Sequence, residues 1–165
     1  MDPKNSHDAA DDEAKAFDFL VGRWRVHHRK LRRRLAGCTD WDEFEGELYS
    51  RPLLGGLGNI DENKLGDPSG AYEAVALRLF DPALRRWSIW WVDGRRNLLE
   101  PPVHGDFRSG TGVFTGKDVL DGRPILIRFF WTGMETGRPR WEQAFSGDGG
   151  DTWETNWIMQ LEPLA

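Results

Sequence analysis

The residues whose chemistry stands out are polar and aromatic side chains at alternate positions along strand-like stretches. Alternate residues of a strand face the same side of a sheet, so a polar residue in phase with apolar ones points into the same space. A few polar groups in an apolar hollow are the usual make-up of a small-molecule site. The candidate ligand-binding residues on this basis are Trp24, His28, Arg78, Arg128, Trp141, Gln143, Thr155 and Trp157.

Three residues are candidates for acid–base chemistry. His28 lies in phase with Trp24 and Val26, which predicts that its ring points inward. A single histidine is more often a hydrogen-bonded core residue than an acid or a base. Together with His104 and Glu142, it would nevertheless serve a barrel-type isomerase, cyclase or lyase.

Two arginines pose a question of direction. Arg128 either points inward, where it suits a ligand carboxylate, or points outward, where it forms a cross-strand ion pair with Glu142. Arg78 shares a strand face with Ala74 and Ala76, and such small neighbours would leave room for a ligand. The sequence leaves both directions open.

The last hairpin is marked by SGDGGDTW at residues 146–153, which resembles an Asp-box, S-x-D-x-G-x-T-W. In that hairpin an aspartate accepts hydrogen bonds from turn N–H groups and a tryptophan anchors the turn in the core. Its role is structural, and one copy implies nothing of the sialidase chemistry found in propellers that repeat it.

The Asp-box also suggests a register, with Ser146 opposite Thr152. One face of the hairpin then carries Trp141, Gln143, Phe145, Trp153, Thr155 and Trp157. The opposite face would bury Glu142, and burying an unpaired carboxylate costs several kcal/mol. We therefore expect the aromatic face inward, with Gln143 and Thr155 as polar points.

Metal and nucleophile signatures are absent from the sequence. There is no H-x-x-x-H or C-x-x-C spacing, no G-x-S-x-G elbow and no phosphate loop, so no metal or cofactor is expected. Cys38 is expected to be an unreactive loop thiol. As the single cysteine it permits no intrachain disulfide, which favours a reducing compartment and predicts a cytoplasmic location.

Charge limits the partners. The net charge of −5 argues against a general nucleic-acid binder. The basic run HHRKLRRR at residues 27–34 is either a funnel for anionic ligands or an exposed strand end balanced by the acidic segment 40–47, and the second interpretation is favoured. No secretory signal and no run of about 18 apolar residues is present, so no membrane partner is expected.

The elements that must position these residues are short strands. Nine tryptophans and nine phenylalanines favour strands, and 19 glycines and nine prolines punctuate them. Sequential hairpins predict an all-β fold, a closed antiparallel up-and-down barrel of about ten strands, with a sandwich as the alternative. The predicted strands span residues 23–31, 41–49, 57–62, 71–80, 86–92, 103–108, 112–117, 124–132, 140–146 and 152–161.

The rest of the chain completes one domain. A short helical stretch over residues 12–20 is expected to plug one end of the barrel, residues 1–14 to form a disordered acidic tail, and residues 15–165 to form the single barrel domain. Several strands carry apolar residues on both faces. Because a barrel buries only its inner face, we expect a homodimer to cover the outer one.

Three segments carry a family resemblance. FDFLVGRW at 17–24 resembles the opening of lipocalin-like proteins, where a Gly-x-Trp (here Gly22 and Trp24) begins the first strand and the tryptophan packs across the closed end. With LGGLGNIDE at 54–62 and the closing RWEQAFS and TWETNW, residues 17–161 resemble bacterial calycin-like proteins of unknown function, relatives of lipocalins and fatty-acid-binding proteins. The resemblance implies a ten-stranded barrel but no substrate. Haem, as in nitrobindin-like barrels, is not expected because the last histidine is His104.

The sequence therefore predicts a barrel that binds a small hydrophobic or amphipathic molecule in its interior. Two alternatives stay open: the barrel-type enzyme, and a solid-cored protein whose surface binds another protein.

Overall fold

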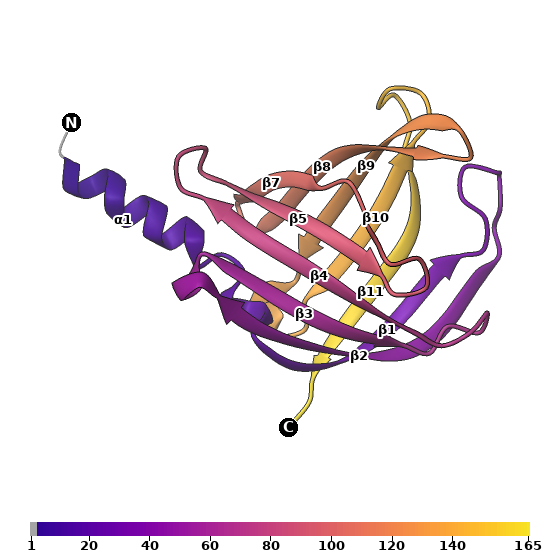
Figure 1. Cartoon of the computed structure of the whole chain (residues 1–165), viewed down its shortest axis with the longest axis horizontal. Coiled ribbons are helices and arrows are strands. Elements are labelled where there is room, and N and C mark those ends of the chain that lie inside the picture. The colour runs from indigo at the N-terminus through magenta and orange to yellow at the C-terminus, as the bar shows by residue number, and fades with distance from the viewer. Residues whose placement is uncertain (1–2) are drawn as a thin grey trace.

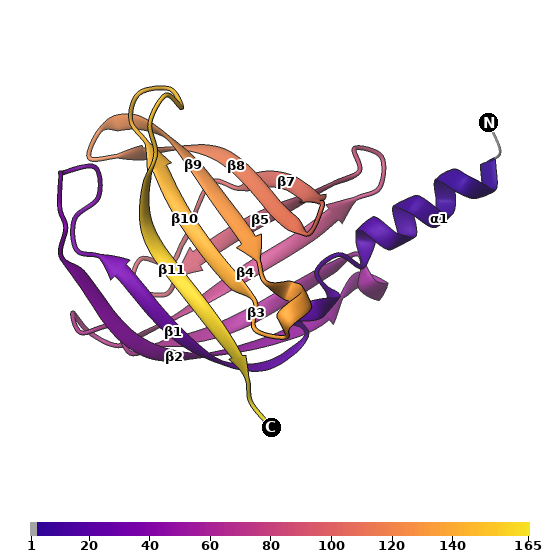
Figure 2. The same ribbon diagram turned by 180° about the vertical axis from the view of Figure 1, so that it is seen from behind.

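The computed structural model describes the backbone of residues 3–165 and the side chains of residues 9–165. Within them ten strands form a closed antiparallel ring, in which chain neighbours pair and β1 closes against β11 (Figures 1 and 2). The predicted closed up-and-down barrel is confirmed, and the sandwich is not formed. The ring consists of β1 Gly22–Leu31, β2 Trp41–Leu53, β3 Gly58–Leu65, β4 Tyr72–Asp81, β5 Arg86–Asp93, β7 Val103–Arg108, β8 Thr111–Leu120, β9 Arg123–Thr132, β10 Arg140–Ser146 and β11 Glu154–Pro163. The two-residue strand β6, Leu98–Leu99, pairs only with the end of β5.

The alternation of side chains explains why these segments form barrel strands. Along β4, every second residue from Tyr72 to Phe80 is buried, and the residues between them are more exposed. Tight turns join the strands: between β8 and β9, Asp121 and Gly122 both have positive φ, as a two-residue hairpin turn requires. The strand period thus places one residue in two inside the barrel.

A short helical segment closes one end of the barrel, as the sequence predicts. It contains the 3-10 helix η1, Asp18–Leu20, preceded by Phe17, whose side chain is 1% exposed. The Trp24 indole N–H donates to the Leu20 carbonyl at 2.7 Å and so ties this segment to β1. The Phe17 ring packs within 6.0 Å, between ring centroids, of Trp87, Phe107, Phe114 and Trp131. We call residues 17–20 and these rings the plug.

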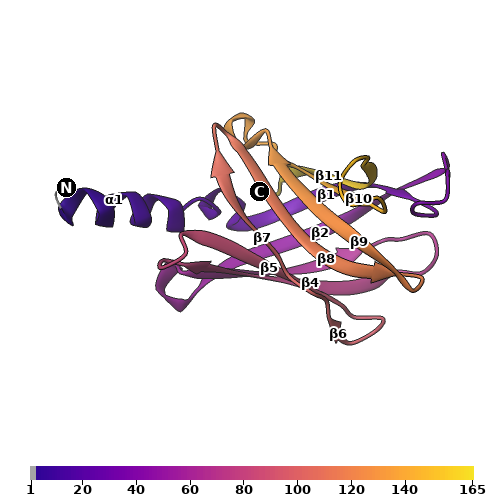
Figure 3. The same ribbon diagram turned by 90° about the horizontal axis from the view of Figure 1, so that it is seen from above.

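The predicted disordered tail differs from the structure, in which α1, Pro3–Ala14, is helical and projects away from the barrel (Figure 3). Its last turn is held in two ways. The Trp87 indole N–H donates to the Glu13 carbonyl at 3.0 Å, and the Glu13 carboxylate pairs with Arg85 at 2.7 Å. Residues 1–2 lie outside the described residues. No helix in the described part of the chain is long and apolar enough to cross a membrane.

The register predicted for the last hairpin is wrong. Next to the turn, Phe145 pairs with Glu154. A β-bulge between Gln143 and Ala144 then shifts the pairing of the earlier part of β10 by one residue, so that Gln143 pairs with Trp157. The turn consumes more chain than predicted because β11 begins only at Glu154. The bulge leaves Asn156 as the extra residue on β11.

The turn before β11 has the hydrogen bonds that its sequence predicts. The Asp148 carboxylate accepts from the Thr152 backbone N–H at 2.9 Å and from its hydroxyl at 2.5 Å, and from the Ser146 hydroxyl at 2.8 Å. These bonds, the Thr152 hydroxyl first, lower the pKa of Asp148 to about 2. The Asp-box predicts that Trp153 anchors the turn in the core, and this prediction is wrong. Its ring is partly exposed and lies 4.1 Å from the Arg128 guanidinium.

Candidate functional site

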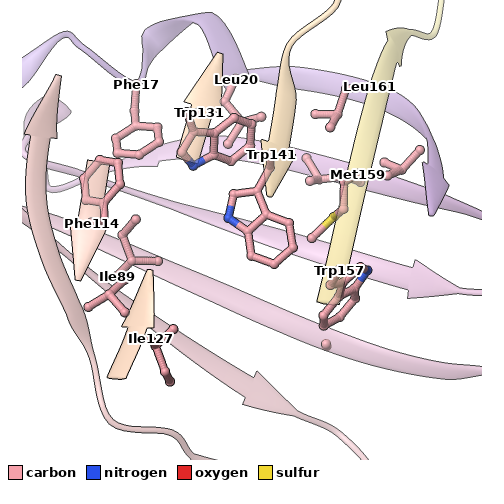
Figure 4. Packing of buried hydrophobic residues seen from close by; sticks show 14 of the residues in the cluster. Phe17, Leu20, Ile89, Phe114, Ile127, Trp131, Trp141, Trp157, Met159 and Leu161 are labelled. Carbon is pink, nitrogen blue, oxygen red and sulfur yellow. The ribbon is translucent and has the colours of Figure 1, made fainter. Parts of the chain in front are cut away.

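The barrel encloses a cavity of about 340 Å³ between the plug and the opposite end. This volume lies at the lower end of small-molecule sites, roughly 300–1,000 Å³. Its wall is mostly aliphatic and aromatic (Figure 4), so it favours an apolar ligand body. The apolar lining residues include Leu48, Ile89, Trp91, Val103, Ile125, Ile127, Phe129, Trp131, Trp141, Phe145, Trp157 and Met159.

The cavity floor, next to the plug, holds a buried ion pair. Arg78 Nη1 donates to Asp61 Oδ2 at 2.7 Å and to Asn59 Oδ1 at 3.1 Å, and its guanidinium lies 5.2 Å from the Phe17 ring. Asp61, which is fully buried, also accepts from Asn63 Nδ2 at 2.8 Å and from the Ala76 N–H at 3.1 Å. The arginine points inward, which the sequence left open, and its charge is matched by a carboxylate.

Three buried donors in or beside the cavity have no acceptor among the described residues. They are Arg78 Nε and Trp131 Nε1, whose side chains line the cavity, and Asn156 Nδ2. In Figure 4 the indole nitrogens of Trp131 and Trp141 lie on the sides of their rings that face Phe114 and Ile89. A buried donor left unpaired costs about 1–3 kcal/mol, so these groups favour an acceptor inside the cavity.

A polar pair interrupts the aromatic wall. Gln143 Nε2 donates to Asn156 Oδ1 at 2.8 Å, and both side chains are buried. Asn156, which the sequence did not select, is brought inward by the bulge and holds Gln143, which lines the cavity. Simple alternation puts Trp157, Met159 and Leu161 on the same face as Thr155, so this pattern gave no sign of the bulge at Asn156.

His28 is buried behind the cavity wall rather than in the lining. Its Nδ1 accepts from the Trp157 indole N–H at 3.1 Å, and its ring stacks on Phe44 with centroids 4.7 Å apart. Burial, with smaller contributions from the charges of Lys30 and His27, lowers the pKa of His28 to about 3. The ring is therefore a neutral acceptor that orients Trp157, and Trp157 does line the cavity.

The structure brings together four of the eight predicted site residues. Arg78, Trp141, Gln143 and Trp157 line the cavity. Trp24 belongs to the closed end, as predicted, and His28 lies behind Trp157.

The remaining two predicted site residues lie outside. The bulge places Thr155 at an exposed position, and Arg128 lies on the outer face of β9, over the rings of Phe130 and Trp153. Arg128 also forms no ion pair with Glu142, whose partner is Arg140 at 3.2 Å. Aromatic stacking replaces the cross-strand pair that the sequence predicts for an outward Arg128.

The acid–base candidates are separated from one another. Glu142 is on the outer face of β10, paired with Arg140. His104, whose pKa is lowered by burial and by the charge of Arg86, bonds to the Ser88 hydroxyl at 2.7 Å and lines a different, shallow groove beside Glu13. Neither these two residues nor His28 lines the cavity.

The cavity opens at the end opposite the plug, and charged residues surround this mouth. They are Lys30, Arg34, Asp93, Arg95, Arg96, Glu100 and Asp118, with Tyr72 among them. None of them was predicted from the sequence to be a site residue. A signal was present, because Lys30 continues the inward phase of Trp24, Val26 and His28 along β1.

Other surfaces offer less enclosed sites. A broad groove on the outside of the barrel, lined by residues of β11, β1, β2, β3 and the start of β4, carries charges of both signs, including Arg25, Glu47 and Glu73. Among the described residues, no three His, Cys, Asp or Glu side chains are grouped as metal ligands. No protein-family model matches this chain, and no curated protein matches it either. The assignment of the cavity as the site therefore depends on its geometry.

Proposed function

We propose that this protein binds one small, largely apolar molecule inside its barrel. The observation that carries the proposal is the cavity of about 340 Å³, apolar along its wall and bordered by buried donors without protein acceptors. An acceptor oxygen on the ligand, or a water enclosed with it, would satisfy those donors. Aromatic rings on several strands supply the contact area.

The family resemblance supports the same proposal. The closed barrel, the plug and the position of Trp24 at the closed end agree with a calycin-like protein, a class in which ligands occupy the barrel interior. We propose membership of that class on the three sequence segments and this architecture together. A cytoplasmic location, suggested by the single Cys38, stays a prediction.

Binding should be visible in the protein's own fluorescence. Titration with decan-1-ol, an uncharged probe, should shift the emission of the cavity tryptophans and raise the melting temperature by mass action. Ala76 lines the cavity, and Ala76→Leu should weaken this binding about tenfold or more by occupying ligand volume. Val75→Leu, on the outer face of the same strand, is the matched control and should leave binding unchanged. Failure of decan-1-ol and of a broad set of apolar and aromatic compounds to change either signal would overturn the proposal.

The homodimer is a second proposal, supported by the outer face of β4 and β5. Val75, Leu77, Leu79, Trp90 and Val92 lie half-buried there, and Val75 pairs with Val92 and Leu77 with Trp90 across the two strands. We expect sedimentation to give a dimer at micromolar concentration, and Leu77→Lys to give a monomer with its fold intact by circular dichroism. A wild-type protein that sediments as a monomer would contradict it.

A further inference from the structure

The mouth of the cavity brings three cations around one tyrosine. Lys30 lies near the end of β1, Arg34 in the loop that follows it, and Arg95 in the turn after β5. Lys30 Nζ is 3.3 Å from the Tyr72 hydroxyl, and the Arg95 guanidinium lies 3.6 Å from the centre of the Tyr72 ring. All four residues line the cavity, so these charges face the space in which a ligand would lie.

The acids near these cations do not match all of them. Lys30 pairs with Asp67 at 3.5 Å and Arg95 with Asp93 at 2.7 Å. Arg34 forms no ion pair with any carboxylate of the described residues, and its guanidinium lies 5.4 Å from the Phe145 ring.

The far side of the mouth carries one more negative than positive charge. Arg96 pairs with Glu100. Burial raises the pKa of Glu100, and the negative charge of Asp118 raises it further. On the side of the mouth that holds Lys30, Arg34 is the cation without a carboxylate in ion-pair contact, although the charge of Glu100 acts to raise its pKa.

The cations also disfavour one another. Burial first, and then the charge of Arg34, lowers the pKa of Lys30 to about 8, with Arg95 acting in the same direction and Asp67 opposing it. Burial likewise lowers the pKa of Arg34. Two partly desolvated cations that repel each other are stabilised when an anion lies between them.

The basic run of β1 and its loop divides into two sets. His27 pairs with Glu43 and Glu45, Arg29 with Glu43, and Arg32 with Asp42, all on the outside. Lys30 and Arg34 turn into the mouth instead. The balanced strand end thus describes the outward residues, whereas Lys30 and Arg34 are two cations at the entrance of the cavity.

We infer that Lys30 and Arg34 bind the carboxylate of an amphipathic monocarboxylic acid at the mouth, with its apolar tail in the cavity. The inference rests on the proposed function and names the class of ligand. Arg34 has no carboxylate of its own in ion-pair contact, and a guanidinium can bind a carboxylate through two parallel hydrogen bonds. The Trp157 ring lies 4.5 Å from Lys30 Nζ and is part of the apolar wall, so the proposed carboxylate site adjoins the apolar part of the cavity.

A ligand series with one alkyl chain tests the head group. Decanoic acid, decan-1-ol and decyl phosphate should be titrated by calorimetry at pH 7, and the acid should bind about tenfold or more tightly than the alcohol. Equal affinities for acid and alcohol would overturn the inference and leave the proposed function standing. Tighter binding of the phosphate than of the acid would overturn the choice of a monocarboxylate. Binding of none of the three would count against the proposed function itself.

Variants then test the two residues. Arg34→Gln and Lys30→Gln should each remove most of the preference for the acid over decan-1-ol, whereas Arg34→Lys should keep part of the preference. Arg32→Gln, in the same loop but paired on the outside with Asp42, is the matched control. Decan-1-ol binding also reports that each variant is folded. A preference that survives in both Gln variants would overturn the inference.

The pH dependence gives an independent readout. Between pH 7 and pH 9 the acid should bind less tightly as Lys30 loses its proton, and decan-1-ol should not change. Tyr72, whose pKa burial raises to about 12, stays neutral over this range, and Asp67, Asp93 and Arg95 keep their charges, because their pKa values are shifted in favour of the charged form. The experiment uses a Cys38→Ser background, because hydrogen bonds lower the pKa of the Cys38 thiol in the same loop. Acid affinity that stays constant to pH 9, or falls equally in Lys30→Gln, would contradict the role of Lys30.

Discussion

Arg78→Met will lower the free energy of unfolding by about 3–5 kcal/mol, because it leaves the Asp61 carboxylate buried without its cation. Arg78 is 5% exposed and Asp61 is fully buried, so water reaches neither group freely. Asp61 would keep only its bonds to Asn63 and to the Ala76 N–H. The same change at Arg128, which lies on the outer face over Trp153, should cost about 1 kcal/mol or less.

A double-mutant cycle in urea isolates the pair. Asp61→Asn alone should also be strongly destabilising, since it leaves the Arg78 cation unmatched. The double variant Arg78→Met/Asp61→Asn should be more stable than either single variant, because no unpaired charge stays buried. If the two single effects simply add, the ion pair does not support the floor of the cavity.

The inward position of Arg78 shows what alternation along one strand can and cannot predict. The phase of β4 was readable from Tyr72, Ala74 and Phe80, and it placed Arg78 with them. Whether an arginine can occupy a buried position depends on its partner, and Asp61 is 17 residues away on β3. The predicted strand 57–62 contained Asp61, but without the β3–β4 register nothing in the sequence linked the two charges.

The strands themselves were predictable because turn residues mark their ends. Glycine, proline and Asp-Gly pairs limit where a ladder can continue, and the ten predicted stretches correspond to the ten strands of the ring. The face assignment of the last hairpin was correct for Trp141, Gln143 and Trp157, but it failed at Thr155. A bulge reverses the inward and outward positions of the residues beyond it. Strict alternation cannot predict where one extra residue is inserted.

The mouth was harder to predict than the wall. Lys30 and Arg34 belong to a run of basic residues in which most members are balanced by the neighbouring acidic strand. Strand phase distinguishes Lys30 from Arg29, but Arg34 lies in a loop, where no period applies. The loop conformation, and not residue type, decides that Arg34 reaches the cavity.

Acid will destabilise the protein through His28, by about 2 kcal/mol between pH 7 and pH 5. The pKa of His28 is lowered from its ordinary 6.5 to about 3 in the folded protein, so over this range the unfolded chain binds a proton that the folded one excludes. Stability therefore falls as pH decreases below 6.5 and continues to fall until about pH 3. The cause is the burial of the ring. Its Nδ1 accepts from the Trp157 indole N–H, and the ring stacks on Phe44.

His28→Gln tests this origin, because glutamine does not titrate. Urea unfolding at pH 7, 6 and 5 should show a steep loss of stability in the wild type and a much flatter one in His28→Gln, whatever stability the variant loses at pH 7 from poorer packing. Comparing slopes removes the contributions of His104, whose lowered pKa acts in the same direction, and of Glu100, whose raised pKa acts in the opposite one. Equal slopes in the wild type and His28→Gln would show that His28 takes up a proton without unfolding, and that Trp157 is not held by a neutral imidazole.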